Sequence, residues 1–304
     1  MKNGLRLTLV GLGDVGGTLL TALKLLGDEI DEIGIYDPYD PLIDRYCMEL
    51  GQVLERPTPT VVRRAKEALF DCDVFLFAAS KGVPPVGAGG DVRMLQFAGN
   101  RDLLLPYAKQ ARASGFSGLF CQISDPVDLL CQCVYWQSNT DENGAFDGRG
   151  LRESQIVGFG LGVMAARAQY YARLQGLDPA KIAAFGPHGA GLVIANDLEH
   201  YDDALSLALT KQTVEANQAV RALGFKPYIA PALSSACISL LHLLRGKPFY
   251  GAIPTDGIWF GCQAHRTGRG AVPLHDISAL PPQLRGRIER AICTLKEMEP
   301  QCRP

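Results

Sequence analysis

Three glycines near the start of the chain have the spacing of a dinucleotide-binding turn. An apolar run of strand length leads into Gly11, Gly13 and Gly16, which form a Gly-x-Gly-x-x-Gly pattern. Gly11 allows a sharp turn, Gly13 lets the backbone approach a pyrophosphate, and Gly16 lets the following helix pack tightly on its strand. The first N–H groups of that helix, at the positive end of its dipole, suit phosphate oxygens. The pattern therefore predicts a site for a dinucleotide.

An acidic residue downstream of this turn indicates which dinucleotide. Asp37 follows Gly16 at about the 20-residue spacing at which a carboxylate reaches the adenosine ribose hydroxyls. The next residues, Pro38, Tyr39 and Asp40, include no Arg or Lys, so a 2′-phosphate would meet negative charge. We therefore expect NAD rather than NADP. The alternative is that Asp37 is an ordinary turn residue at the end of a strand.

Four further polar points follow along the chain. Arg93 comes after the glycine-rich segment 80–91, a Ser-Asp-Pro-Val-Asp run occupies residues 124–128, Arg167 lies in an apolar stretch, and His188 stands between glycines. Arginine binds carboxylates with two parallel hydrogen bonds, and histidine exchanges protons near neutral pH. Each point also has a structural alternative: a solvated residue, an interface ion pair, or a packed histidine.

The elements that must position these residues alternate between strand and helix. In the first half we expect strands at 5–10, 32–37, 60–62, 73–79 and 119–123, and helices at 17–27, 41–55, 92–113 and 129–137. Segment 80–91 then lies at the carboxyl end of a parallel strand, where α/β sheets bind ligands. In the second half we expect strands at 156–159, 181–185 and 255–264, a turn at 265–270, and helices at 161–174, 202–223, 231–245 and 281–299.

This pattern predicts an α/β chain with a doubly wound parallel sheet. We expect a Rossmann-type NAD domain at residues 1–145, followed by an α+β substrate domain at residues 146–304, with the boundary in the polar loop 138–150.

Composition limits the class of protein. The chain has 304 residues, 47% hydrophobic and 20% charged, with a formal charge of −2. These values are typical of a soluble globular protein and give no reason to expect a nucleic-acid or membrane partner. The 9 cysteines form no Cys-x-x-Cys pair and do not cluster with the 5 histidines, so we expect free thiols, no metal site and a cytoplasmic location.

Taken together, these motifs resemble the L-lactate/malate dehydrogenase family over nearly the whole chain. The glycine turn and Asp37 fit the family pattern, as does Arg93 ahead of Asn100. Residues 124–128 are similar to the family's Ser-Asn-Pro-Val-Asp, and residues 186–189 to its Gly-x-His-Gly. The common order of the motifs makes the resemblance more specific than any one of them.

The resemblance implies a role for each residue. His188 is the general acid that protonates the substrate's oxygen during reduction. Arg93 arrives with a closing loop and polarises the carbonyl, and Arg167 binds the substrate carboxylate. Asp125 and Gly87 are further substrate-binding positions. The cofactor-binding residues that the resemblance implies are Gly11, Gly13, Asp14, Val15, Gly16, Asp37, Ala78, Asn100, Ile123 and Asp125. It also implies a homodimer or homotetramer.

Three departures from the family pattern matter. The family's aspartate that holds the second nitrogen of the histidine is Met164 here, so we expect the pKa of His188 to lie below that of a carboxylate-paired histidine. The family's substrate-contacting asparagine is Asp125, an anion that would repel a carboxylate unless it is protonated or moves to partner His188. Gly87 replaces the arginine expected for malate and leaves room for a larger side chain.

The sequence thus predicts an NAD-dependent L-2-hydroxyacid dehydrogenase acting on a small 2-oxo or 2-hydroxy acid. We expect the substrate not to be malate and to carry a bulkier, uncharged side chain. Two alternatives stay open. One is a reductase whose cationic substrate pairs with Asp125. The other is a catalytically impaired, NAD-binding regulatory or scaffold protein that has lost its histidine partner at Met164.

Overall fold

The computed structural model describes residues 4–55, 58–82, 92–268 and 270–304, and the side chains of residues 92–95 also lie outside the description. The first half contains β1 (Leu5–Val10), α1 (Asp14–Leu26), β2 (Ile30–Tyr36), α2 (Asp40–Gly51), β3 (Thr60–Arg63), β4 (Val74–Phe77), α3 (Val92–Ala113), β5 (Leu119–Gln122), α4 (Val127–Ser138) and β6 (Ile156–Gly158). The second half contains α5 (Leu161–Leu174), β7 (Ala183–Phe185), β8 (Val193–Ala195), α6 (Asp203–Ala222), the π-helix η4 (Pro231–Ile238), α7 (Ser239–Leu244), β9 (Phe249–Thr255), β10 (Ile258–Thr267), β11 (Gly270–Pro273) and α8 (Pro282–Met298). Short 3₁₀ turns are η1 (Lys66–Ala68), η2 (Glu153–Gln155), η3 (Pro179–Lys181), η5 (Ile277–Ala279) and η6 (Glu299–Cys302).

A nine-stranded sheet forms the centre of the described chain, with the strand order β11-β10-β9-β6-β5-β4-β1-β2-β3. The six strands from β3 to β6 are parallel, and β9 to β11 extend the sheet in antiparallel fashion. The chain leaves β1 toward one edge and returns at β4 toward the other, so the topological switch lies between β1 and β4. Ligands bind outside the carboxyl ends of the strands at such a point. The predicted doubly wound fold is confirmed.

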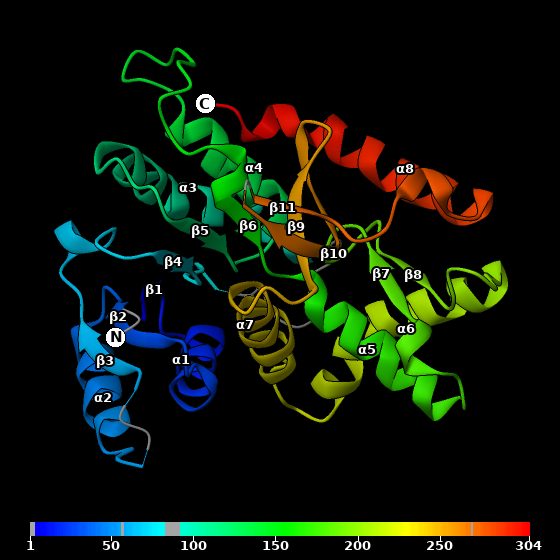
Figure 1. Ribbon diagram of the computed structural model, residues 1–304, viewed down its shortest axis with the longest axis horizontal. Helices are drawn as coiled ribbons and strands as arrows, with labels where there is room; N and C mark the ends of the chain where they lie inside the picture. Colours follow the sequence, from blue (N-terminus) through cyan, green and yellow to red (C-terminus); the bar gives the residue numbers. More distant parts are fainter. Residues whose placement is uncertain (1–3, 56–57, 83–91, 269) are drawn as a thin grey trace.

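Helices cover both faces of this sheet (Figure 1). The four residues of β4 are all buried, as parallel strands between two helical layers should be. In Figure 1, α3 and α4 lie on one side of the parallel strands, and α1 and α7 on the other. A second apolar core, smaller than the main one, joins α5 to the β7–β8 hairpin and includes Met164, Ile194 and Leu209. The final helix α8 contacts both β8 and β10, so it packs across the second half.

Two predicted elements in the second half are wrong in detail. The stretch expected as one strand at 255–264 holds the last residue of β9, a two-residue turn and most of β10. The turn places Asp256 at φ +52° and Gly257 at φ +83°. Asp-Gly is a strong hairpin signal that the prediction passed over. The turn expected at 265–270 is shorter, because β10 runs to Thr267 and β11 starts at Gly270. Strand β8 was not predicted, since three apolar residues carry too little pattern.

The parallel sheet continues past the expected domain boundary. Strand β6 lies after residue 145 and pairs with β5 of the first half. The division at 145/146 stays a prediction, and the sheet alone does not mark it. Across the described residues, no helix has the length and apolar character needed to cross a membrane. All nine cysteines are free; Cys47 and Cys72 are half-buried, Cys293 is exposed, and the other six are buried.

Candidate active site

The turn after β1 has a backbone that only glycine accommodates. Gly11 adopts φ +91°, and a Cβ built on it would lie 2.5 Å from the Cα of Ala79. A Cβ on Gly16 would lie 1.9 Å from the carbonyl oxygen of Gly11. A Cβ on Gly13, by contrast, would meet nothing within 4 Å, so this residue borders open space. The turn therefore has the close packing and the one open approach that a pyrophosphate requires.

Asp37 lies directly beside this turn. Its Oδ2 accepts a hydrogen bond from the backbone N–H of Leu12 at 2.9 Å, and its Oδ1 accepts one from Tyr39 at 3.0 Å. A carboxylate has further lone pairs for ligand hydroxyls. These contacts place the acid at the end of β2 next to the glycine turn, where an adenosine ribose would be bound.

The arginines nearest this acidic end are already paired. Arg63, at the end of β3, donates to Asp40 at 2.5 Å and to Asp44 at 2.6 Å. Hydrogen bonds to these two carboxylates raise the pKa of Arg63. Arg64 pairs with Glu32 at 2.5 Å. Because acids already balance both guanidinium groups, the ribose end has an environment that suits a hydroxyl better than a phosphate.

The loops after β4 and β5 are tied to each other. The Ser124 hydroxyl donates to the carbonyl of Ala79 at 2.6 Å. The Asn100 amide accepts from the N–H of Lys81 at 3.0 Å and donates to the carbonyl of Asp125 at 2.8 Å. Asn100 is 1% exposed, so its side chain is a buried link between the two loops. These contacts join the loop after β4 to the loop after β5, which carries Asp125.

Asp125, in the loop after β5, forms a hydrogen-bonded pair with His188, which follows β7. His188 Nδ1 lies 3.0 Å from Asp125 Oδ1, with the histidine side chain 9% and the aspartate side chain 28% exposed. A carboxylate accepts at this distance from an Nδ1–H. A Cβ on Gly160 would come within 3.0 Å of His188 Cβ, so the glycine before α5 makes room for the ring. The expectation that His188 lacks a nearby carboxylate is therefore wrong: Asp125 provides one.

A second carboxyl group lies beneath this pair. Asp128, in the first turn of α4, is 5% exposed. Burial raises the pKa of Asp128 to about 7, although backbone N–H groups of Asp128, His188 and Gly261 oppose the rise. The nearby charge of Asp125 acts in the same direction as burial. Asp128 therefore links the first turn of α4 to the backbone that carries His188.

Arg167 is held by a residue that the sequence did not single out. On α5, its Nη2 donates to Asn217 Oδ1 of α6 at 2.5 Å, and its Nη1 lies 3.6 Å from Met164 Sδ. Met164 is 0% exposed and belongs to the second apolar core. Asn217 carries no motif, so only the fold could have revealed it.

The remaining predicted residues fall into three pairs. Ala78 and Ile123 continue the strands β4 and β5: their N–H groups donate to the carbonyls of Val10 at 2.8 Å and Phe77 at 2.9 Å, respectively. Asp14, in the first turn of α1 beside Val15, pairs with the exposed Lys226 at 3.0 Å. Gly87 and the side chain of Arg93 lie outside the described residues, so their roles stay predictions.

No model of a protein family matches the chain. The L-lactate dehydrogenase of Mesomycoplasma hyopneumoniae strain 232 is 25% identical over 196 residues, covering 63% of this chain and 57% of that protein. The L-lactate dehydrogenase of Corynebacterium efficiens is 28% identical over 193 residues, covering 61% and 55%. The matched stretch thus spans less than two thirds of these relatives' length.

Solved structures match over nearly the whole chain. The minor L-lactate dehydrogenase of Enterococcus mundtii superposes with a TM-score of 0.80 at 18% identity and covers 99% of both chains. The malate dehydrogenase of Archaeoglobus fulgidus, solved with NADH, gives 0.81 at 16% identity, covering 98% of this chain and 99% of that one. At such identities the structures establish the fold alone. The sequence relatives and this fold together support the L-lactate/malate dehydrogenase family for this chain, and the low identities fit a divergent member.

Proposed function

We propose that the chain is an NAD-dependent L-2-hydroxyacid dehydrogenase that acts on a small 2-oxo acid with an uncharged side chain. The single observation that carries the proposal is the Asp125–His188 pair, at 3.0 Å, beside the carboxyl end of β5. A histidine oriented by a carboxylate is a general acid and base. Its position on the carboxyl side of the parallel strands is where this fold binds ligands.

The residues present fit the cofactor. Gly13 borders the open space that a pyrophosphate needs, Gly11 and Gly16 allow the tight turn beside it, and Asp37 lies next to that turn. When bound, NADH supplies the hydride. The paired Arg63 leaves little free positive charge for a 2′-phosphate, which supports NAD over NADP.

The substrate is handled by three side chains in this proposal. Arg167 binds the carboxylate, and Asn217 fixes the orientation of its guanidinium. His188 donates its Nε2 proton to the carbonyl oxygen during reduction, because Nδ1 is engaged by Asp125. Asp125 stabilises the imidazolium that gives up this proton. Arg93 polarises the carbonyl, a role that rests on the family resemblance.

The charge of Asp125 supports an uncharged substrate side chain. A second carboxylate on the substrate, as in oxaloacetate, would lie in a site that already contains this anion. Gly87 adds no cation that would offset the repulsion. The same pairing weakens the cationic-substrate alternative, because Asp125 Oδ1 is committed to His188. It also removes the reason for inferring an impaired enzyme, since the histidine has kept a carboxylate partner.

A substrate panel tests the proposal. Oxidation of NADH is followed with pyruvate, oxaloacetate, and branched and aromatic 2-oxo acids, using wild type and His188→Asn. We expect turnover of an acid with a neutral side chain, weaker turnover of oxaloacetate, and loss of activity in His188→Asn. His200→Asn is the matched control, because its side chain is 79% exposed.

Three results would reject the proposal: no turnover of any acid, a preference for oxaloacetate, or an active His188→Asn variant. Binding of NADH without turnover would instead favour a regulatory or scaffold protein. The homo-oligomeric state and the cytoplasmic location stay predictions, which light scattering and cell fractionation would test.

A further inference from the structure

A cavity lies at the amino ends of the parallel strands, away from the Asp125–His188 pair. It has a volume of about 620 Å³ and is lined by the first residues of three parallel strands, Leu5 of β1, Val74 of β4 and Leu119 of β5. The Asp125–His188 pair, by contrast, follows the carboxyl ends of β5 and β7. The cavity is therefore separate from the candidate active site, and its volume is in the range of small-molecule pockets.

The walls of this cavity are built by specific contacts. The Gln155 amide donates to the carbonyls of Phe116 at 3.2 Å and Gly118 at 3.0 Å, and its oxygen accepts from the N–H of Arg152 at 3.1 Å. Gly270 has φ +134°, and a Cβ there would lie 2.8 Å from Ser154 Cβ, so the β10–β11 hairpin packs tightly against this wall. The cavity is thus largely preformed.

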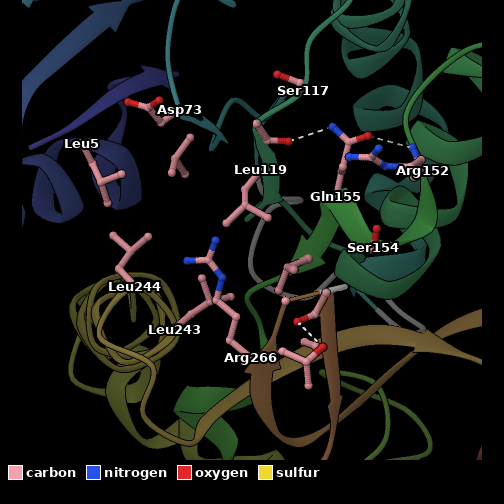
Figure 2. Close-up of a pocket in the computed structure, with 17 residues that line it drawn as sticks. Leu5, Asp73, Ser117, Leu119, Arg152, Ser154, Gln155, Leu243, Leu244 and Arg266 are labelled. Atoms are coloured by element: carbon pink, nitrogen blue, oxygen red, sulfur yellow. Dashed lines mark hydrogen bonds between the residues drawn. The ribbon is translucent and has the colours of Figure 1, made fainter. Parts of the chain in front are cut away.

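The cavity also contains positive charge next to apolar surface. Figure 2 shows the Arg266 guanidinium projecting into the space near Leu119 and Leu243, with Arg152 on another wall. The Arg266 backbone pairs with Ala271 of β11, whereas its side chain makes no hydrogen bond or ion pair with any described residue. Burial raises the pKa of the Cys121 thiol within β5, and the Arg266 charge is close enough to oppose that rise. The Arg266 guanidinium therefore lies close to β5.

One acid lines the cavity and does not cancel this charge. Asp73 precedes β4, and its Oδ2 accepts the backbone N–H of Arg6 at 2.8 Å. Two guanidinium groups against one carboxylate leave the cavity with a net positive charge. Guanidinium matches carboxylate in shape and hydrogen-bond geometry.

We propose that this cavity binds an organic carboxylate with an apolar body. The carboxylate contacts Arg266, and the body lies against Leu119, Leu243 and Leu244. Both halves of the ligand are needed, because an ion pair open to water contributes little alone and apolar contact supplies most of the affinity.

Calorimetry of the full chain with straight-chain carboxylates tests the proposal directly. Affinity should rise from butanoate through hexanoate to octanoate by up to about fourfold per buried methylene, the equivalent of about 0.8 kcal/mol. Octanol and inorganic phosphate, which each lack one half of the ligand, should bind more weakly than octanoate. An affinity that does not change with chain length, or no detectable octanoate binding, would overturn the proposal.

Variants locate the binding. Arg266→Gln should weaken octanoate by about fivefold to tenfold, as expected for loss of an exposed charge-assisted contact. Arg266→Lys should fall between this variant and wild type. Arg290→Gln, an exposed arginine of α8 away from the cavity, should bind like wild type.

The candidate active site provides the decisive comparison. Arg167→Gln should leave octanoate binding unchanged, because Arg167 lies outside the cavity. If Arg167→Gln abolishes binding, or Arg266→Gln binds as wild type does, the octanoate site is elsewhere and the proposal fails. No turnover is measured, so the result is independent of the proposed dehydrogenase activity.

Discussion

Replacing Asp125 by asparagine tests the most specific feature of the site. The amide keeps a hydrogen-bond acceptor near His188 Nδ1 but removes the negative charge 3.0 Å away. At an effective dielectric of about 20, two charges at this distance interact by about 5 to 6 kcal/mol, an upper bound. The Asp125 side chain is 28% exposed, so water reduces this figure. We expect about 2 to 4 kcal/mol to be lost from the protonated state of the histidine.

This loss has two measurable consequences in an NADH-linked assay. The kcat/KM for reduction should fall by about 30-fold to 1,000-fold. The pH at which reduction declines should also move to lower values, because the imidazolium has lost its stabilising anion. Asp71→Asn serves as the matched control, since Asp71 is exposed and lies just before the amino end of β4.

A second substitution distinguishes the position of the acid from its mere presence. Met164→Asp in wild type should bring little gain, because Asp125 already engages Nδ1. In the Asp125→Asn background, the same change should restore part of the rate, provided that thermal unfolding shows an intact fold. If Asp125→Asn retains kcat/KM within about threefold and an unchanged pH profile, the carboxylate does not support the histidine and the reasoning is refuted.

Three further predictions concern the rest of the site. Asn217→Ala should raise KM for the 2-oxo acid by about tenfold and leave KM for NADH unchanged, because Asn217 holds the Arg167 guanidinium. Asp37→Ser should weaken NADH by about tenfold or more while changing NADPH much less, as fluorescence titration would show, because the acid lies at the ribose end. Since burial raises the pKa of Asp128 to about 7 from an unfolded value of about 3.9, its protonated form favours the folded state. This contribution to stability is complete below about pH 4 and is lost as pH rises to about 7. The free energy of unfolding in urea should therefore fall by up to about 3 kcal/mol between pH 5 and pH 8 in wild type, and by less in Asp128→Asn.

Each of these predictions has a result that contradicts it. Equal effects of Asn217→Ala on both Michaelis constants would indicate a general loss of structure. Equal weakening of NADH and NADPH by Asp37→Ser would mean that the acid does not contact the ribose. Parallel pH dependence of stability in wild type and Asp128→Asn would show that the buried carboxyl is ionised throughout this range.

The sequence was most informative where a local motif fixes the backbone. The glycine turn and the apolar strands predicted the parallel half of the sheet, because glycine at positive φ and two-sided burial leave direct marks on composition. The β9–β10 hairpin was missed although Asp256 and Gly257 carry its signal. Strand β8 is too short for any periodicity to appear.

The site itself needed the fold. The sequence placed an aspartate at 125 and a histidine at 188, but their meeting depends on how β5 and β7 are brought together. Reasoning from the family position at Met164 suggested an unsupported histidine, because a motif describes one location for a function and not the other locations that the fold offers. Asn217 illustrates the same limit, since nothing in its helix distinguishes it from a solvated residue.

The buried Asn100 side chain couples the positions of two loops. Its amide joins Lys81, after the strand next to the glycine turn, to the backbone of the same Asp125 that holds His188. Because Asn100 is buried and bonded to both loops, a displacement of the loop after β4 would also move the backbone of Asp125. The two loops therefore respond as one body, and a molecule pressing on either of them would shift the residue that faces the imidazole.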